Sequence, residues 1–488
     1  MRHPILFAIL APMLFAWPCH GQSGGDIPED VKQSIHARVD GGRNMGIVVG
    51  VIDEAGTHYY GYGTTSRSGG ETPDERTVFE IGSITKVFTA LLLADMVVKN
   101  EVALNDPISQ HLPPHVAAPR RKNRSIRLVH LATHTSGLPR MPAKVTPASR
   151  DNPFTDCTVE EMYDYLSGYL LVRDIGQHYE YSNFGAGLLG HILALRAGTT
   201  YQELVKTRIT EVLELPDTRI TPSQSMNLRL ARGYQDGFEV RNLEFQALEG
   251  AAALRSTARD MLRFLEANLG LVHTLLADAL RLTHTPRSRQ GTGGMQVALG
   301  WHVRLQTDRA ILWHDGATGG YRSFVAFDRE SLRGVVVLTN SAWSVNDLGF
   351  HLLDRSYPLV EVRPSIAAEL RERIAEEGID AAVRLYRDVK EGAPERYDFR
   401  ESELNRLGHN YLLLGEIGTA LSIFRLNVEA YPDAPGPYAS LGEAYLALGD
   451  TTLAVVNTMK SLELHPRNRN AVEMLGRMGV DFGGRPEN

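Results

Sequence analysis

The stretch FEIGSITKVFTALLLA, residues Phe79–Ala94, places a serine and a lysine three residues apart where a short apolar strand gives way to an apolar helix. Residues with this spacing share a helix face about 5–6 Å apart, so Ser83 and Lys86 are expected to be in contact. A serine is a poor nucleophile until a base takes its proton, and lysine becomes that base only when its pKa falls on burial. The stretch therefore predicts a nucleophile and its base. A capping serine followed by a solvated lysine would fit the same short motif.

The composition is that of an ordinary globular protein, with 43% hydrophobic and 22% charged residues. A chain of 488 residues is expected to form more than one domain. Its net charge of −7 argues against a nucleic-acid-binding surface, and the one basic cluster, at 120–124, is expected to be a solvated loop. Histidines are scattered, and no His-Glu-x-x-His or paired Cys-x-x-Cys occurs. We expect no metal and no cofactor.

The N-terminus has the pattern of an export signal. Arg2 and His3 precede an apolar run, Ile5–Trp17, of 13 residues, which fits a signal-peptide core and is too short to span a bilayer. We expect a signal peptide over residues 1–24 and a periplasmic location. Trp17 and Pro18 stand where a lipid-attachment box has small residues, so a lipid anchor at Cys19 is not expected. No later stretch is expected to form a transmembrane helix.

Strand patterns stand at both ends of the region before residue 355. Residues 45–63 predict two strands around a turn, and four further strands are expected in VALGWHVRL, AILWHDG, RSFVAFD and RGVVVLTNS, which end near Ser341. The residues between are mostly helical in pattern. The predicted class is α+β: an antiparallel sheet whose first and last strands pair, flanked by helices, with an inserted helical lobe.

The C-terminal part repeats itself. Small and aromatic positions recur 34 residues apart, from Leu407-Gly408, Tyr411, Gly415, Ala420 and Pro432 to Leu441-Gly442, Tyr445, Gly449, Ala454 and Pro466. This period resembles the helix-turn-helix tetratricopeptide (TPR) pattern, with a partial third copy from Val472. We expect an all-α tail. A solenoid this short buries its faces poorly alone, so it is expected to dock on the preceding domain or on a partner.

Two further motifs supply companions for Ser83. YEYSNFGAGLLG contains Tyr181-Ser182-Asn183 before an apolar helix, and WHDGATGGYRS contains His314-Asp315-Gly316 at a strand end. With Ser-x-x-Lys, they resemble the ordered motifs of serine beta-lactamases and penicillin-binding proteins. The resemblance is closest to the class C beta-lactamase-like branch with His-x-Gly and covers residues 27–355, including LATHTSGLP (131–139) and STARDM (256–261).

The resemblance implies a role for each matching position. Ser83 would attack the carbonyl, Lys86 would take its proton directly or through Tyr181, and Tyr181 would protonate the leaving group. Asn183 would hold Lys86 and the substrate amide. The predicted oxyanion hole consists of the backbone N–H groups of Ser83 and Ala317. Which of Lys86 and Tyr181 is the general base stays open.

The third motif departs from the pattern of true class C beta-lactamases. His314 stands where they carry a lysine, which is a fixed cation for the substrate carboxylate, and no lysine occurs between Lys206 and Lys390. Histidine is largely neutral at pH 7 and is a weaker anchor for a carboxylate. His314 and Gly316 are still expected at the substrate, and Arg322 is either a compensating cation or a surface residue. The departure favours a peptidase or esterase over an efficient beta-lactamase.

Two functions follow. The first is an exported serine hydrolase that forms an acyl-enzyme on D-amino-acid peptides, small esters or, weakly, beta-lactams. The second is a catalytically weak binding module whose TPR tail recruits a protein partner. Specificity is expected to depend on loops such as 137–156 and 222–250. The expected domains are the hydrolase over 25–362, a helical linker over 363–400 and TPR-like repeats over 401–488.

Overall fold

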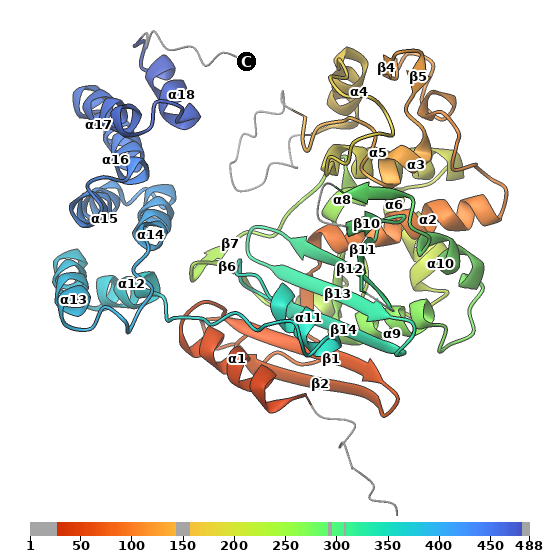
Figure 1. Cartoon of the computed structure of the whole chain (residues 1–488), viewed down its shortest axis with the longest axis horizontal. Coiled ribbons are helices and arrows are strands. Elements are labelled where there is room, and N and C mark those ends of the chain that lie inside the picture. Colours follow the sequence, from red (N-terminus) through yellow and green to blue (C-terminus); the bar gives the residue numbers. More distant parts are fainter. Residues whose placement is uncertain (1–26, 143–156, 291–294, 307–308, 481–488) are drawn as a thin grey trace, which may run out of the picture.

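A computed structural model of the chain describes residues 27–142, 157–290, 295–306 and 309–480. It contains an antiparallel sheet domain with helices on both faces and a tail of helices at the C-terminal end (Figure 1). The expected signal peptide and Cys19 lie outside the described residues. None of the helices within the described ranges has both the length and the hydropathy that a bilayer crossing needs.

The central sheet has eight antiparallel strands in the order β2-β1-β14-β13-β12-β11-β10-β9. The expected pairing of the first and last strands is confirmed, because β1 lies against β14 with Ile47 opposite Thr339. One expected strand, VALGWHVRL, is wrong as a single element: a turn at Gly300 (φ 72°) separates β10 from β11. The strands are β1 (Gly46–Asp53), β2 (Gly56–Gly63), β9 (Ser288–Gln290), β10 (Met295–Val297), β11 (His302–Leu305), β12 (Ala310–Ala317), β13 (Arg322–Asp328) and β14 (Arg333–Thr339).

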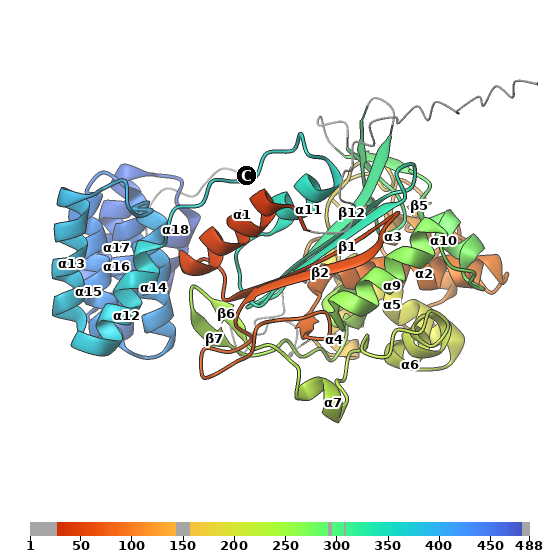
Figure 2. The same ribbon diagram turned by 90° about the horizontal axis from the view of Figure 1, so that it is seen from below.

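Both faces of the sheet are buried, which explains the nearly continuous apolar runs of β1 and β14. Val49 and Val337 point to the face covered by α1 (Glu29–Asp40) and α11 (Asn346–Leu353). Val48 and Val336 point to the other face and its larger core. That core is covered by α2 (Thr85–Val98), α9 (Ala258–Leu269) and α10 (Ala277–Thr283), as Figure 2 shows from below.

The inserted lobe surrounds the buried helix α2. It also contains three short strand pairs, β3 with β8, β4 with β5, and β6 with β7. Of these strands, only β3 matches an expectation, the short apolar strand before Ser83. These strands are β3 (Val78–Glu80), β4 (Arg120–Arg121), β5 (Arg124–Ser125), β6 (Gly233–Gln235), β7 (Phe238–Val240) and β8 (Arg255–Thr257). The α-helices are α3 (Leu128–Ala132), α4 (Val159–Gly168), α5 (Asn183–Ala197), α6 (Tyr201–Val205), α7 (Gln224–Asn227) and α8 (Glu249–Ala252). The 3₁₀-helices are η1 (Gly82–Ile84) and η2 (Ile108–Gln110), and η3 (Lys206–Thr210) is a π-helix.

The tail consists of helices that pack in consecutive pairs, α12 with α13, α14 with α15, and α16 with α17. Residues 363–400, expected as a linker, contain α12 and α13, whose apolar side chains share one core with α14, α15 and α16. A Cβ on Gly408 of α14 would come within 2.4 Å of Phe424, so only glycine lets this pair approach so closely. The helices are α12 (Ile366–Glu377), α13 (Ile379–Gly392), α14 (Glu401–Leu413), α15 (Ile417–Ala430), α16 (Pro435–Leu448), α17 (Thr451–Leu464) and α18 (Arg469–Arg477).

Candidate active site

Ser83 lies in the tight turn η1, between the short strand β3 and the buried helix α2. Gly82 before it has a positive φ of 49°, and a Cβ there would lie only 2.8 Å from the backbone nitrogen of Ala317. A side chain at this position would therefore separate the turn from the end of β12. The glycine lets the backbones of Ser83 and Ala317 come together, as an oxyanion hole requires.

Lys86 contacts Ser83 as the spacing predicts. Its Nζ donates to Ser83 Oγ at 2.9 Å and to the carbonyl oxygen of Ala251, on α8, at 2.7 Å. The side chain is buried because nearly the whole of α2 is enclosed by the core. Burial holds the pKa of Lys86 well below its ordinary value of 10.5, and the charge of Arg140 acts in the same direction, whereas Asp315 opposes it. An amine with this pKa can accept the proton of Ser83.

Tyr181 lies on the other side of this pair. Lys86 Nζ is 4.8 Å from the centroid of its ring. Burial raises the pKa of Tyr181 far above 10, and a hydrogen bond to the Ser83 side chain acts in the opposite direction. The chain is fixed here by Ser182, which caps α5 by accepting from the backbone of Gly185 and donates its own N–H to His134 Nδ1 at 3.1 Å. Tyr181 is therefore a protonated phenol held beside the nucleophile.

Asn183 begins α5 and lies at the wall of the same cavity as Ser83. The contact with Lys86 that the resemblance implied does not form: Asn183 Nδ2 lies against the sulfur of Met141 at 3.8 Å. Its Oδ1 is buried and has no hydrogen-bond partner among the described residues. An unpaired buried acceptor is costly, so an N–H group that reached it would be favoured.

The residues of the third motif divide into two groups on β12. Ala317 reaches the cavity beside Ser83. His314 is buried, and its Nδ1 donates to the backbone oxygen of Asp315 at 2.6 Å. Gly316 packs against the carbonyl of Ile81, where a Cβ would be 2.0 Å from the oxygen. Neither His314 nor Gly316 is among the described residues that line the cavity.

Arg322, the other candidate cation, is partly buried and is not a surface residue. Its Nη1 donates to the backbone oxygens of Thr318 and Tyr321, both at 2.9 Å. The guanidinium is therefore engaged with the turn between β12 and β13. Arg140 is the cation that lines the cavity, and its guanidinium lies 5.2 Å from the centroid of the Tyr181 ring.

A group of buried histidines surrounds Tyr181, which sequence reasoning did not identify. The ring of His134 lies 4.4 Å from that of Tyr181, and His302 lies 5.0 Å from His314. Burial lowers the pKa of His302 to about 4 and holds the pKa values of His134 and His314 well below 6.5. Neutral imidazoles therefore surround the Tyr181 ring. His134 lies within the quoted LATHTSGLP stretch, which was a usable signal, whereas His302 stands in no motif. No group of three or more His, Cys, Asp or Glu side chains in the described part of the chain is arranged to hold a metal ion.

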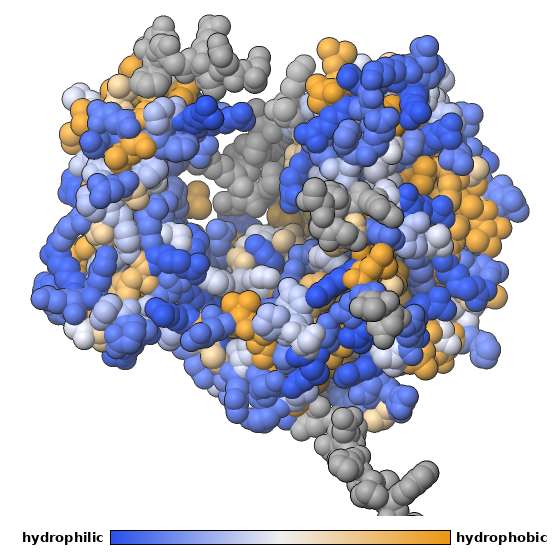
Figure 3. Space-filling model, viewed as in Figure 1, coloured by the Kyte–Doolittle hydropathy of each residue, from blue (hydrophilic) through white to orange (hydrophobic). Residues whose placement is uncertain are grey.

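Ser83 opens into a cavity of about 770 Å³. One side is formed by the domain that contains the central sheet, with Ser83, Asn183 and Ala317 among its residues. The other side is formed by the tail, through α14 and α16. Figure 3 shows the molecule hollowed between these two parts. Docking of the tail on the preceding domain or on a partner was expected, but no sequence pattern indicated that the tail would line the cavity of Ser83.

Comparison with known proteins agrees with this geometry. The Beta-lactamase family model matches residues 31–349, so α12 to α18 lie beyond the match. The D-alanyl-D-alanine-carboxypeptidase/endopeptidase AmpH of Escherichia coli K12 is 29% identical over 359 residues, covering 70% of this chain and 92% of that protein. A beta-lactamase of Escherichia coli K12 is 26% identical over 351 residues, covering 64% of this chain and 89% of that protein.

Solved structures show the same similarity. A class C beta-lactamase from Rhodobacter sphaeroides superposes with a TM-score of 0.59 at 25% identity, covering 67% of this chain and 99% of that one. A beta-lactamase/D-alanine carboxypeptidase from Pseudomonas syringae gives the same TM-score and identity and covers 98% of that chain. The predicted fold, an antiparallel sheet with flanking helices and an all-α tail, is confirmed. The chain belongs to the beta-lactamase family and is a serine hydrolase.

Proposed function

We propose that this protein is an exported serine hydrolase that acts through an acyl-enzyme at Ser83 and releases D-alanine from peptides that end in D-alanyl-D-alanine. The observation that carries the proposal is the 2.9 Å contact between Ser83 Oγ and the buried Lys86 Nζ, whose pKa is well below its ordinary value. Small esters and, more slowly, beta-lactams are further substrates of the same chemistry.

In the acylation step Ser83 Oγ attacks the substrate carbonyl carbon while Lys86 Nζ takes the hydroxyl proton, directly or through Tyr181. The carbonyl oxygen becomes an oxyanion, which the N–H groups of Ser83 and Ala317 stabilise. When the bond to the leaving group breaks, Tyr181 donates a proton to the departing nitrogen or oxygen and is reprotonated from Lys86. Water then attacks the ester of Ser83, and the same groups return the proton to Ser83.

The preference for a peptidase over an efficient beta-lactamase rests on His314. A buried imidazole with a depressed pKa carries no charge at neutral pH, so it does not supply the fixed cation that a lysine would. The name of the E. coli relative, a D-alanyl-D-alanine-carboxypeptidase/endopeptidase, supports the same substrate class. Export through a signal peptide over residues 1–24 to the periplasm, and the assignment of the tail as TPR-like repeats, are parts of this proposal.

The test is a substrate panel at a single pH. The purified protein is expected to release D-alanine from an acyl-D-Ala-D-Ala peptide and to hydrolyse p-nitrophenyl acetate, with a much lower kcat/KM for a chromogenic cephalosporin. Ser83→Ala should abolish all three reactions and keep the same circular dichroism spectrum. Efficient cephalosporin turnover without D-alanine release would contradict the preference, and turnover that survives in Ser83→Ala would contradict the mechanism.

The alternative, a weak binding module whose tail recruits a protein partner, predicts a different result. A folded wild-type protein would then show no turnover that depends on Ser83. The intact Ser83, Lys86 and Tyr181 arrangement favours the enzyme.

A further inference from the structure

The inner face of the tail points at the catalytic serine of the same chain. His409, Leu412 and Leu413 of α14, with Glu443 and Ala447 of α16, line the cavity into which Ser83 opens. We infer that this face is a binding groove for the acyl part of an extended peptide substrate whose C-terminal end reaches Ser83. The inference rests on the proposed function and names the length and chemistry of its substrate.

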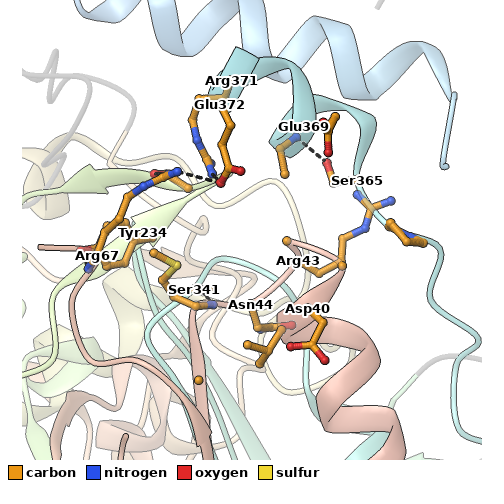
Figure 4. Close-up of a pocket in the computed structure, with 18 of the residues that line it drawn as sticks. Asp40, Arg43, Asn44, Arg67, Tyr234, Ser341, Ser365, Glu369, Arg371 and Glu372 are labelled. Carbon is orange, nitrogen blue, oxygen red and sulfur yellow. Dashed lines mark hydrogen bonds and ion pairs between the residues drawn. The ribbon is translucent and has the colours of Figure 1, made fainter. Parts of the chain in front are cut away.

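The tail packs against the hydrolase domain through a buried interface. Arg43 is buried between two tail carboxylates, with its Nη1 2.7 Å from Glu403 and its Nη2 2.8 Å from Asp398. The β6–β7 hairpin adds a second contact, in which Phe238 packs edge-on against Tyr411 of α14 at 5.3 Å. Figure 4 shows the polar pocket at this junction, with Arg43 on one side and α12 on the other. Glu403 is fully buried, which marks this contact as a packed interface.

The shared cavity lies on the acyl side of the reacting bond. Asn183 and the strand end at Thr318 border it, whereas Tyr181, Arg322 and His314 are not among the described residues that line it. Tyr181 is the proposed proton donor to the leaving group, so the leaving group points away from the tail. The part of the substrate that faces the tail is therefore the acyl chain that stays on Ser83.

Part of the cavity wall is apolar. Leu412 and Leu413 from the tail face Met141, Val240 and Leu243 of the hydrolase domain across it. Leu413 is 59% exposed. Such an apolar surface next to a nucleophile favours an apolar group on the bound acyl chain, because burial against leucine removes it from water.

Beyond the leucines the groove becomes polar. A second cavity of about 670 Å³ runs along α14, α16 and α18 and shares His409, Glu443 and Ala447 with the first. The same position of each repeat lines this groove, because its lining includes three residues spaced 34 apart, His409, Glu443 and Arg477. The helices α14, α16 and α18 therefore turn equivalent faces toward it. Carboxamides from Asn405, Asn468 and Asn470 also line it.

Asn405 Oδ1 is buried and has no hydrogen-bond partner among the described residues, so it favours the N–H groups of a peptide, which a hydrocarbon chain does not offer. Asn468 is already engaged within the tail, where its carboxamide caps α18 and donates to Ser461. The chemistry therefore fits a peptide better than a fatty acyl chain. The helices α14, α16 and α18 are neighbours. With about 8–10 Å between neighbouring helices, the groove spans roughly 16–20 Å, the length of about five or six extended residues.

The experiment uses the full chain and a series of N-acetylated peptides of two, four, six and eight residues that end in D-Ala-D-Ala. We expect kcat/KM for D-alanine release to rise about tenfold or more up to six residues and then to level off. Leu413→Asp should remove most of that gain, measured as the ratio of kcat/KM for the six-residue peptide to kcat/KM for the two-residue peptide. Leu414→Asp is the matched control. Leu414 follows Leu413 in the chain and is 61% exposed but does not line the cavity, so this variant should behave as wild type.

Three results overturn the inference. In the first, kcat/KM is independent of peptide length although ester turnover is normal and depends on Ser83. That result would refute the binding groove and leave the proposed function intact. In the second, Leu413→Asp and Leu414→Asp lower the long-peptide rate equally. In the third, p-nitrophenyl esters of two to twelve carbons show the Leu413-dependent gain and peptides do not, which assigns the groove to a lipid chain. Absence of any turnover that depends on Ser83 would instead refute the proposed function itself, and the inference with it.

Discussion

Two buried basic side chains, one in the active site and one at the tail interface, are used in opposite ways. Lys86 is enclosed by α2, Ser83 and the carbonyl of Ala251, and in the described part of the chain no carboxylate lies within ion-pair distance of its Nζ. Arg43 is as deeply buried but is paired with both Glu403 and Asp398. Burial without a counter-ion lowers the pKa of a lysine, so that its amine can act as a base. A guanidinium paired with two carboxylates instead holds two surfaces together.

The largest effect is expected at Lys86. Lys86→Arg keeps a positive charge but cannot take a proton, and Lys86→Met keeps the length without the charge. Loss of a positioned general base costs about 10²–10⁴-fold in rate, so both variants should lose that much in acylation rate, measured by single-turnover ester hydrolysis. Lys99→Arg, at the C-terminal cap of the same helix, is the control and should be silent. Near-normal turnover in Lys86→Arg would make the lysine a structural charge.

Arg43 should affect stability and leave the chemistry intact. Arg43→Ala removes the cation that joins Glu403 and Asp398, although Glu403 keeps Arg406 and the Ser365 hydroxyl as partners. The cost should therefore lie below the roughly 3–5 kcal/mol of a buried charge left with no partner. We expect a lower unfolding temperature and faster proteolytic release of the tail, with p-nitrophenyl acetate turnover retained by the remaining domain.

Removal of the chain after residue 362 should likewise leave a folded, ester-hydrolysing domain. An insoluble truncated protein would show that the tail is part of one folding unit.

The histidines around Tyr181 predict an acid-sensitive fold. His302, with its pKa lowered to about 4, is neutral in the folded protein between pH 6.5 and 4, while the unfolded chain binds a proton there. Stability therefore falls as the pH drops below 6.5, by up to about 1.4 kcal/mol per pH unit for each such histidine. Urea unfolding at pH 7.5, 6.5 and 5.5 measures this fall. His302→Phe should make it shallower, and an unchanged slope in that variant would contradict the assignment.

The smallest effect is expected at Arg67, whose ion pair with Glu372 crosses the same interface at 2.9 Å but is exposed to solvent. Exposed pairs contribute about 0–1 kcal/mol, so Arg67→Ala should shift the unfolding free energy by no more than that. A loss as large as that of Arg43→Ala would show that burial does not distinguish the two contacts.

The features that the sequence predicted well are contacts within one helical turn and patterns that recur along the chain. The contact between Ser83 and Lys86 depends on three residues of one helical turn, and the pairing of β1 with β14 follows from strand patterns at the two ends of a domain. The approach of the tail to Ser83 is different in kind. It depends on Arg43 meeting Glu403, 360 residues later, and no periodicity reports such a contact.

The orientation of individual side chains was also beyond the sequence. Asn183 was expected to hold Lys86, but the lysine has its second partner in the carbonyl of Ala251, which a residue pattern does not reveal. His302 joins the site only because β11 pairs with β12, where it lies opposite Trp313 beside His314. The loop 137–156, expected to set specificity, lies mostly outside the described residues, but its Met141 lines the cavity. The other loop expected to set specificity, 222–250, contributes Gln235, Val240 and Leu243 to the cavity.

Every step of the proposed mechanism requires that Ser83 becomes covalently acylated. Its most direct test is the intact mass of the protein after reaction with a fluorophosphonate or penicillin probe, followed by peptide mapping. We predict one adduct, located on Ser83, absent from Ser83→Ala and much slower to form in Lys86→Arg. A folded wild-type protein that stays unlabelled by both probes, or an adduct on a different residue, would contradict it.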